Sequence, residues 1–106
     1  MSGISTGADD QIQLRQRPSL KRPSNYTVIM LNDDYTTMEF VIECLVSIFK
    51  QDAEHAYSVM LDVHTKGAGI CGVYSKEIAE TRISIVHSRA RKAGFPLQCI
   101  MEKNDD

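Results

Sequence analysis

The sequence predicts an α+β fold: a small two-layer α/β sandwich in which three helices cover a three-stranded antiparallel sheet. The chain has 106 residues with 42% hydrophobic and 25% charged residues, an ordinary globular mix that fits one domain. Three short β-type runs alternate with helix-type patterns in the order β-α-α-β-α-β. Since three strands cannot enclose a core alone, the helices must cover one face of the sheet.

The first strand and helix follow from residue types near the start of this core. Residues 26–31 are β-branched and aromatic with little polarity, which predicts a strand well covered by other elements. Turn-forming residues 32–35 end the strand. Thr36 precedes Glu39 by three residues, the spacing of a capping box. Apolar residues at helical spacing then predict a first helix that continues to Phe49.

The second helix and second strand are bounded by clear end signals. Asp52 is a good N-cap, and Gly67 stops the second helix as a C-terminal glycine does. Residues 69–74 form a short second strand. Ser75 caps a third helix, which Gly94 ends.

The third helix also carries basic residues near its C-terminus. Arg89, Arg91 and Lys92 lie there, where positive charge favours the helix dipole. Pro96 cannot continue a helix, so the chain turns into a last strand over residues 97–102. Each predicted element therefore has a start and a stop.

The charge distribution divides the chain into a tail and a core. Twelve basic against 14 acidic residues give a net charge of −2, which argues against a nucleic-acid-binding protein. Residues 1–24 lack apolar periodicity, so we expect a flexible N-terminal tail followed by a core domain over residues 25–106. No run approaches the 18 apolar residues that would cross a membrane.

Three cysteines and two histidines receive a structural interpretation. Cys44, Cys71 and Cys99 are far apart and apolar in context, which predicts reduced core residues of a cytoplasmic protein without a metal site. His55 and His87 are expected to face solvent without a partner. A monomer is the default.

One loop and one histidine are candidates for binding chemistry. Residues 32–34 (Asn-Asp-Asp) place two carboxylates and an amide at the end of a strand, directly before a helix. Such residues favour turns and helix N-termini, so the loop is explained without any ligand; a functional interpretation needs a cationic one. His64 lies late in the second helix, where a charged imidazole is favoured. Motifs for a nucleophile or a phosphate loop are absent from the sequence.

Two alternatives to a binding loop stay open from the residues alone. Asp33, Asp34 and His64 offer oxygen and nitrogen ligands for a small metal-dependent hydrolase. A ribosome-associated binding module is suggested only by the expected fold.

Several stretches of the chain resemble the ClpS family, the bacterial adaptors of the N-end rule pathway. The most specific stretch is residues 30–41, which contains Asn-Asp-Asp-Tyr-Thr followed by Met-Glu-Phe-Val. Residues 60–64, 67–74, 79–81 and 94–97 follow in the order and spacing of the family. Thr37 departs from the proline that many members carry.

The resemblance implies a fold and a function for residues 24–103. The fold would be the sandwich shared with the C-terminal domain of the ribosomal stalk protein. Family members are not enzymes and need no cofactor. They capture proteins whose first residue is Leu, Phe, Tyr or Trp, and deliver them to the ClpA unfoldase of the ClpAP protease.

By resemblance, the free amino group of a substrate would bind to Asn32, Asp33 and His64, with Asp34 and Thr36 in support. A cationic amine offers three donors, whereas an internal peptide N–H offers one and carries no charge. This difference would restrict the site to the beginnings of chains.

An apolar pocket beside the amine site is also implied by the family. Met38 stands at the gatekeeper position, where a bulky residue would exclude side chains branched at Cβ. Simple core packing is the competing interpretation for the lining residues. The implied lining is Met38, Val41, Met60, Val63 and Leu97.

The family pattern assigns the partner-binding residues to the third helix. Glu77 and Arg82 match positions that dock on the N-terminal domain of ClpA or a related Clp ATPase. Arg82 stands where lysine is common, so the charge is kept and the geometry changes. The N-terminal tail would take part in handing over the substrate.

Overall fold

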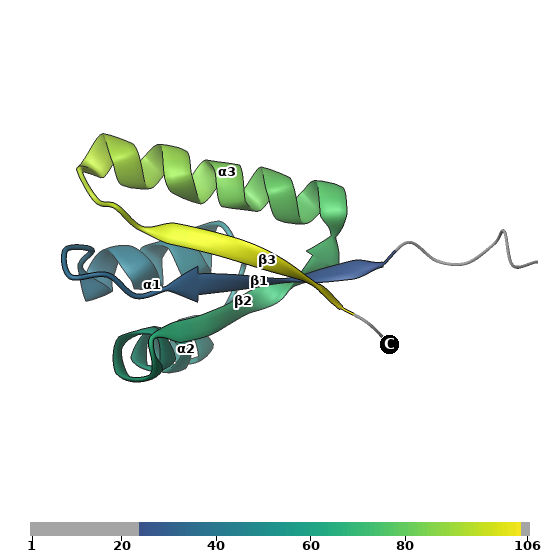
Figure 1. Ribbon diagram of the computed structural model, residues 1–106. Coiled ribbons are helices and arrows are strands. Elements are labelled where there is room, and N and C mark those ends of the chain that lie inside the picture. The colour runs from purple at the N-terminus through teal and green to yellow at the C-terminus, as the bar shows by residue number, and fades with distance from the viewer. Residues whose placement is uncertain (1–23, 105–106) are drawn as a thin grey trace, which may run out of the picture.

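The computed structural model describes residues 24–104 and has the predicted α+β architecture (Figure 1). The expected tail over residues 1–24 lies outside the described residues, except for Ser24. The elements are β1 Asn25–Leu31, α1 Met38–Ser47, α2 Ala53–Lys66, β2 Ala68–Ser75, α3 Lys76–Ala93 and β3 Gln98–Asn104.

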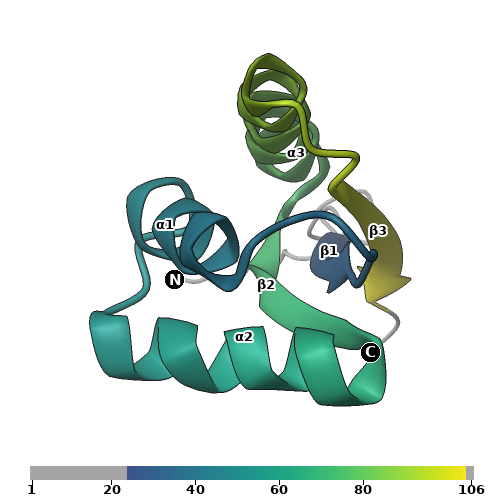
Figure 2. The ribbon, with the colours of Figure 1, turned by 90° about the vertical axis from the view of Figure 1, so that its left-hand side faces the viewer.

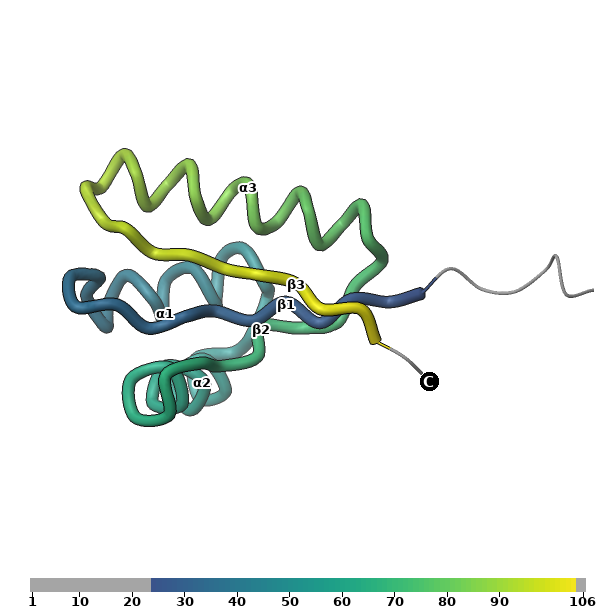
Figure 3. The backbone as a smooth tube through the Cα atoms, viewed as in Figure 1, coloured from purple at the N-terminus to yellow at the C-terminus, as the bar shows by residue number. Residues whose placement is uncertain are grey.

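The sheet has the order β2-β1-β3, and both strand pairs are antiparallel. Ile29 at the centre of β1 pairs with Ile70 on one side and Ile100 on the other. The register with β2 shifts after Val28, where one extra residue enters β2. Figure 3 shows how β1 and β3 run side by side along the molecule.

The three helices lie on one side of the sheet (Figure 2), with α2 against β2 and α3 against β3. The other face is open: Ile70 is 57% exposed and Ile100 is 40% exposed, and Ile29 between them is half-buried. The expectation that the first strand is well covered is therefore wrong for this face. Its inward residues, Val28 and Met30, are fully buried.

The core lies between the sheet and the helices and draws on all six elements. Burying a large apolar side chain contributes roughly 1.5–3 kcal/mol, so a few such residues account for much of the favourable free energy. The largest fully buried side chains are Met30, Leu45, Leu97, Val28, Val86 and Cys44.

The predicted ends of α2 and α3 are confirmed. The side chains of Asp52 and Ser75 accept hydrogen bonds from backbone amides at the two N-termini, over 2.8 Å and 3.4 Å. Gly67 and Gly94 adopt left-handed conformations with φ of 91° and 84° at the two C-termini. Glycine tolerates this conformation because it has no Cβ.

The start of α1 differs from the prediction. Thr37, and not Thr36, is the N-cap, and its hydroxyl accepts from the amide three residues later over 3.1 Å. The capping box between Thr36 and Glu39 is therefore wrong, because the Thr36 side chain is engaged within the preceding loop. The helix also ends at Ser47, two residues before Phe49.

Gly69 allows α2 to lie close to β2. A Cβ at this position would come within 2.8 Å of the Val63 side chain and 2.9 Å of the Val59 carbonyl oxygen. Because one of these neighbours is backbone, a larger residue would push the helix away from the strand. The spacing of α2 therefore depends on this glycine.

Cys44, Cys71 and Cys99 are buried and free, as predicted. His55 is exposed, but the expectation for His87 is wrong. His87 is half-buried, and its Nε2 atom accepts a hydrogen bond from the backbone N–H of Cys99 over 3.1 Å. The imidazole thereby satisfies a donor on the outer edge of β3.

Candidate functional site

Three chain segments meet at one end of the sheet. Leu31, the last residue of β1, pairs with Ala68 and Gln98, the first residues of β2 and β3. The loop 32–37, the C-terminus of α2 and the connection from α3 to β3 therefore lie together, at the left in Figure 1. The predicted amine-binding residues all belong to the first two of these segments.

A backbone hydrogen bond joins the acidic loop to the end of α2. The N–H of Asn32 donates to the carbonyl of Gly67 over 3.0 Å. Gly67 follows the last turn of α2, in which His64 is exposed. The structure thus brings the backbone at Asn32 and the helix end bearing His64 to the same place, with both side chains exposed to solvent.

The Asp33 carboxylate organises the loop. Its Oδ1 atom accepts from the backbone N–H groups of Tyr35 and Thr36 over 2.8 Å and 2.7 Å, and its Oδ2 atom accepts from the Thr36 hydroxyl over 2.7 Å. Burial raises the pKa of this carboxyl, but the hydrogen bonds and the charge of Arg91 outweigh it, so the pKa lies below its usual value. Asp33 is therefore charged and largely engaged within the loop.

Asp34 is placed differently from its neighbour. Its side chain is exposed and makes no hydrogen bond or ion pair with another residue in the 24–104 range. The Asp34 carboxylate can therefore accept from a ligand without giving up a contact.

The predicted pocket residues fall into two groups. Met38, the first residue of α1, is 50% exposed beside the loop. The other four belong to the hydrophobic core, which separates them from the more exposed Met38. Their exposed fractions are Val41 5%, Met60 3%, Val63 3% and Leu97 1%.

Two interactions that sequence reasoning missed hold the connection from α3 to β3. The Phe95 ring packs edge-on against Phe40 of α1, with centroids 5.1 Å apart. The Arg91 guanidinium donates to the carbonyls of Phe95 and Leu97, each over 3.0 Å. In the sequence, Arg91 was distinguished only by its place near a helix C-terminus.

The alternative of a metal-dependent hydrolase finds no metal centre in the described part of the chain. No three His, Cys, Asp or Glu side chains there are grouped so that they would hold a metal ion. Asp33, Asp34 and His64 are therefore not arranged as a ligand set.

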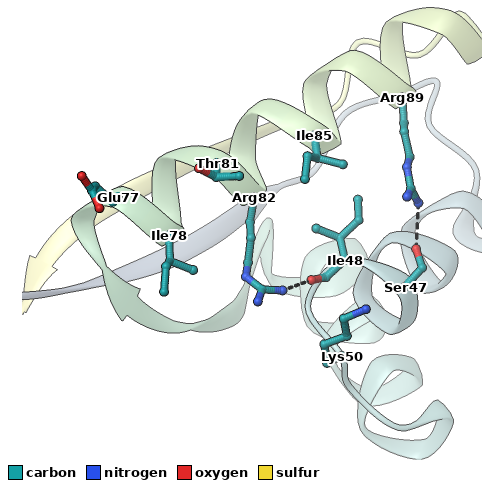
Figure 4. A pocket seen from close by; sticks show the side chains of 9 residues that line it. All are labelled: Ser47, Ile48, Lys50, Glu77, Ile78, Thr81, Arg82, Ile85 and Arg89. Carbon is teal, nitrogen blue, oxygen red and sulfur yellow. Dashed lines mark hydrogen bonds between the residues drawn. The ribbon is translucent and has the colours of Figure 1, made fainter.

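The predicted partner-binding residues lie in a groove between α1 and α3 (Figure 4). Glu77 is exposed in the first turn of α3. Arg82 lies 5.0 Å from the ring centroid of Tyr74 and donates to the carbonyl of Ile48. Arg82 therefore joins the two helices as well as lining the groove, whose floor and rim include Ile78 and Ile85.

A family model described as "ATP-dependent Clp protease adaptor protein ClpS" matches residues 21–100. The chain belongs to the ClpS family. ClpS proteins are adaptors and not enzymes, so this chain is an adaptor of an ATP-dependent Clp protease, with a Clp ATPase as its partner. None of the helices in residues 24–104 has the length and apolar character needed to cross a bilayer.

Relatives and a solved structure agree with this assignment. The ClpS proteins of Oleidesulfovibrio alaskensis and Herminiimonas arsenicoxydans are 49% and 54% identical, over 94% and 90% of this chain and 94% and 93% of theirs. ClpS2 of Agrobacterium tumefaciens, in a structure with bound L-phenylalaninamide, is 36% identical. It superposes with a TM-score of 0.75 and covers 78% of this chain and 100% of its own.

Proposed function

We propose that this ClpS-family chain binds the free first residue of protein substrates, Leu, Phe, Tyr or Trp, at the end of the sheet where loop 32–37 meets α2. The observation that carries the proposal is the bond from Asn32 to Gly67, which fixes the acidic loop beside the helix turn bearing His64. Support comes from the Agrobacterium relative, whose ligand, L-phenylalaninamide, combines a free amino group with an aromatic side chain.

The amine chemistry suits the side chains at this place. An α-amino group has a pKa of about 7.7–8.0 and carries three N–H donors when charged. The amide oxygen of Asn32, a carboxylate and the unprotonated nitrogen of His64 each offer one acceptor. The charge-assisted bond is typically worth about 1.5–3 kcal/mol, and a blocked amine loses it.

Asp33 and Asp34 have different roles in this proposal. Asp33 already accepts three hydrogen bonds from Tyr35 and Thr36, so it holds the loop in shape. A carboxylate has about four lone-pair sites, so the Oδ2 atom of Asp33, which accepts one bond within the loop, can also accept from the amine, and the exposed Asp34 beside it supports the site with a second negative charge. This assignment keeps the roles that the family resemblance implies for Asp33 and Asp34.

The first side chain of the substrate would lie beside Met38, with Val41, Met60, Val63 and Leu97 as the apolar lining. Val41, Met60, Val63 and Leu97 belong to the hydrophobic core cluster, whereas Met38 is 50% exposed. Burial of a large apolar side chain there contributes roughly 1.5–3 kcal/mol. Because the four core residues are buried, Met38 is the member of this set that a ligand can contact directly.

Peptide binding tests this function. A peptide beginning with Phe should bind, and the same peptide with an acetylated amine should bind at least about tenfold more weakly. Asp33→Asn should weaken binding to a similar extent, whereas Asp62→Asn, on α2 and paired with Lys66 over 3.3 Å, should not. Equal binding of the free and acetylated peptides would overturn the proposal.

We further propose delivery to the ClpA unfoldase or a related Clp ATPase through Glu77 and Arg82, with residues 1–24 needed for the handover. Glu77 and the groove beside Arg82 are accessible on α3. Glu77→Lys should abolish binding to the N-terminal domain of the ATPase and leave peptide binding intact. Removal of residues 1–23 should spare both binding steps and stop degradation.

The cellular setting proposed is a cytoplasmic monomer. The three cysteines in the chain are free and buried, which suits a reducing compartment. Thiol labelling and sedimentation of the purified protein would test the two parts separately. A disulfide-linked species in cells, or a dimer at micromolar concentration, would contradict them.

A further inference from the structure

We propose that Arg91 is a positioning residue for the substrate site, because it closes the turn from α3 to β3, which packs on α1 and lies beside the acidic loop. This inference rests on the proposed function. Nothing in the sequence distinguishes Arg91 from its basic neighbours, and its role follows from contacts at the end of α3.

Arg91 closes the turn with both its backbone and its side chain. Its carbonyl accepts from the N–H of Gly94 over 3.1 Å, and its Nη1 atom donates to the carbonyls of Phe95 and Leu97 over 3.0 Å each. A guanidinium is rigid and planar, so two acceptors on one nitrogen fix the turn relative to the helix. The position of Leu97, at 1% exposure, depends on this closure.

The same turn is tied to the start of α1. Phe95 packs against Phe40, two residues after Met38 at the N-terminus of the helix. A shift of the turn would therefore move Leu97 and the region of Met38 relative to each other. Both residues line the proposed apolar pocket.

Arg91 also faces the acidic loop. Tyr35 of the loop and Arg91 line one hollow, together with Gly94, Phe95, Pro96 and Gln98 of the turn and β3. The positive charge lies close enough to favour the charged form of Asp33. Loop 32–37 thus has a hydrogen bond to Gly67 on the α2 side and the positive charge of Arg91 on the α3 side.

Positioning and simple electrostatics predict opposite effects on binding. A cation near the site repels a cationic amine, so removing its charge alone would tighten binding. If Arg91 acts by positioning, its removal weakens binding, because the acceptors and the lining residues lose their arrangement. The sign of the change therefore separates the two roles.

The experiment measures peptide affinity and amide exchange in the full-length protein. Arg91→Gln and Arg91→Ala should weaken binding of a peptide beginning with Phe by at least about tenfold. Arg91→Lys, which keeps the charge and one donor group, should recover part of the loss. Lys92→Ala removes the same charge from the next, exposed residue of α3 and should leave affinity within about twofold.

Hydrogen exchange tests the positioning without any peptide. The amides of Tyr35 and Thr36 donate to Asp33, and they should exchange faster in Arg91→Gln than in Lys92→Ala. Unchanged exchange, or binding as tight as or tighter than the wild type, would overturn the inference. Failure of the wild type to distinguish free from acetylated peptide would instead refute the proposed function.

Discussion

The backbone N–H of Asn32 donates to the carbonyl of Gly67, 35 positions later in the chain, over 3.0 Å. This bond extends the pairing of β1 with β2 by one residue beyond Leu31 and Ala68. It therefore anchors the first residue of the acidic loop to the last turn of α2. The proposed amine site depends on this connection between the two segments.

Asp33 and Asp34 should differ in their effect on stability. Asp33→Ala leaves the amides of Tyr35 and Thr36 without their acceptor, which should cost about 1 kcal/mol. Asp34→Ala should change stability by less than about 0.5 kcal/mol, because its side chain is exposed. Urea unfolding of the two variants at neutral pH measures the difference, and equal losses would contradict the division of roles.

Acid should remove the contribution of Asp33. Its folded pKa lies below the ordinary value of 3.8, so its stabilisation is fully present above the unfolded pKa and is lost as the pH falls through the folded pKa. The difference in the free energy of unfolding between the wild type and Asp33→Asn should therefore shrink as the pH falls below about 3.8. Urea unfolding across that pH range measures this difference. A difference that grows as the pH falls would contradict the prediction.

His87 should make the protein less stable in mild acid. Burial lowers the pKa of His87 from 6.5, and the charge of Arg91 lowers it further. The neutral ring, whose Nε2 accepts from Cys99, thus gives stability that is complete above the unfolded pKa and declines as the pH falls through the folded pKa. His87→Gln should lack this decline in thermal unfolding as the pH falls below 6.5.

The three thiols should react slowly with alkylating reagents in the folded protein. Burial raises the pKa of Cys44 to about 12, and a hydrogen bond with Cys99 together with burial raises the pKa of Cys71. Since the thiolate is the reactive form, labelling near pH 8 should wait for unfolding. Mass spectrometry over time, with and without urea, checks this; rapid native labelling would show that the core opens.

Met38→Ala should broaden the accepted first residues. Met38 is half exposed at the start of α1, where it would lie near Cβ of the ligand. A smaller side chain leaves room for a branched Cβ, so binding of peptides that begin with Val or Ile should rise. Fluorescence titration against Phe, Val and Ile peptides gives the answer. Unchanged selectivity would show that Met38 does not exclude first residues branched at Cβ.

Gly69→Ala should disturb the packing of α2 on β2. The added methyl would meet the Val59 carbonyl and the Val63 side chain at 2.9 Å and 2.8 Å, and overpacking typically costs about 1–3 kcal/mol. Gly72→Ala is a comparison on the same strand in which the nearest atoms belong to the Tyr74 side chain and not to backbone. In thermal unfolding, Gly69→Ala should have a lower melting temperature than Gly72→Ala.

The order of the elements and most helix ends could be predicted because those signals are local. Asp52, Gly67, Ser75 and Gly94 each act through their own backbone or an amide three residues away. The error at α1 arose because Thr36 and Thr37 are both able to cap, and the choice depends on Asp33, which engages Thr36. A competing side chain decided between two equivalent residues.

The site was harder to predict because its contacts join distant residues. Whether Asp33 or Asp34 is free depends on which way the loop turns, and the bonds of Arg91 to Phe95 and Leu97 depend on the turn after α3. The partner of His87 lies on β3, 12 residues away. Residue types and spacing therefore gave the candidates, while tertiary contacts assign their roles.

The length of α3 has a mechanical consequence for an adaptor. Glu77 lies in its first turn and Leu97 follows its far end, and 18 helical residues span roughly 27 Å. A substrate bound near Leu97 and a Clp ATPase bound at Glu77 would therefore not compete for the same atoms. The helix would then serve as a rigid spacer that leaves the substrate-binding end accessible while the ATPase is bound at the other end.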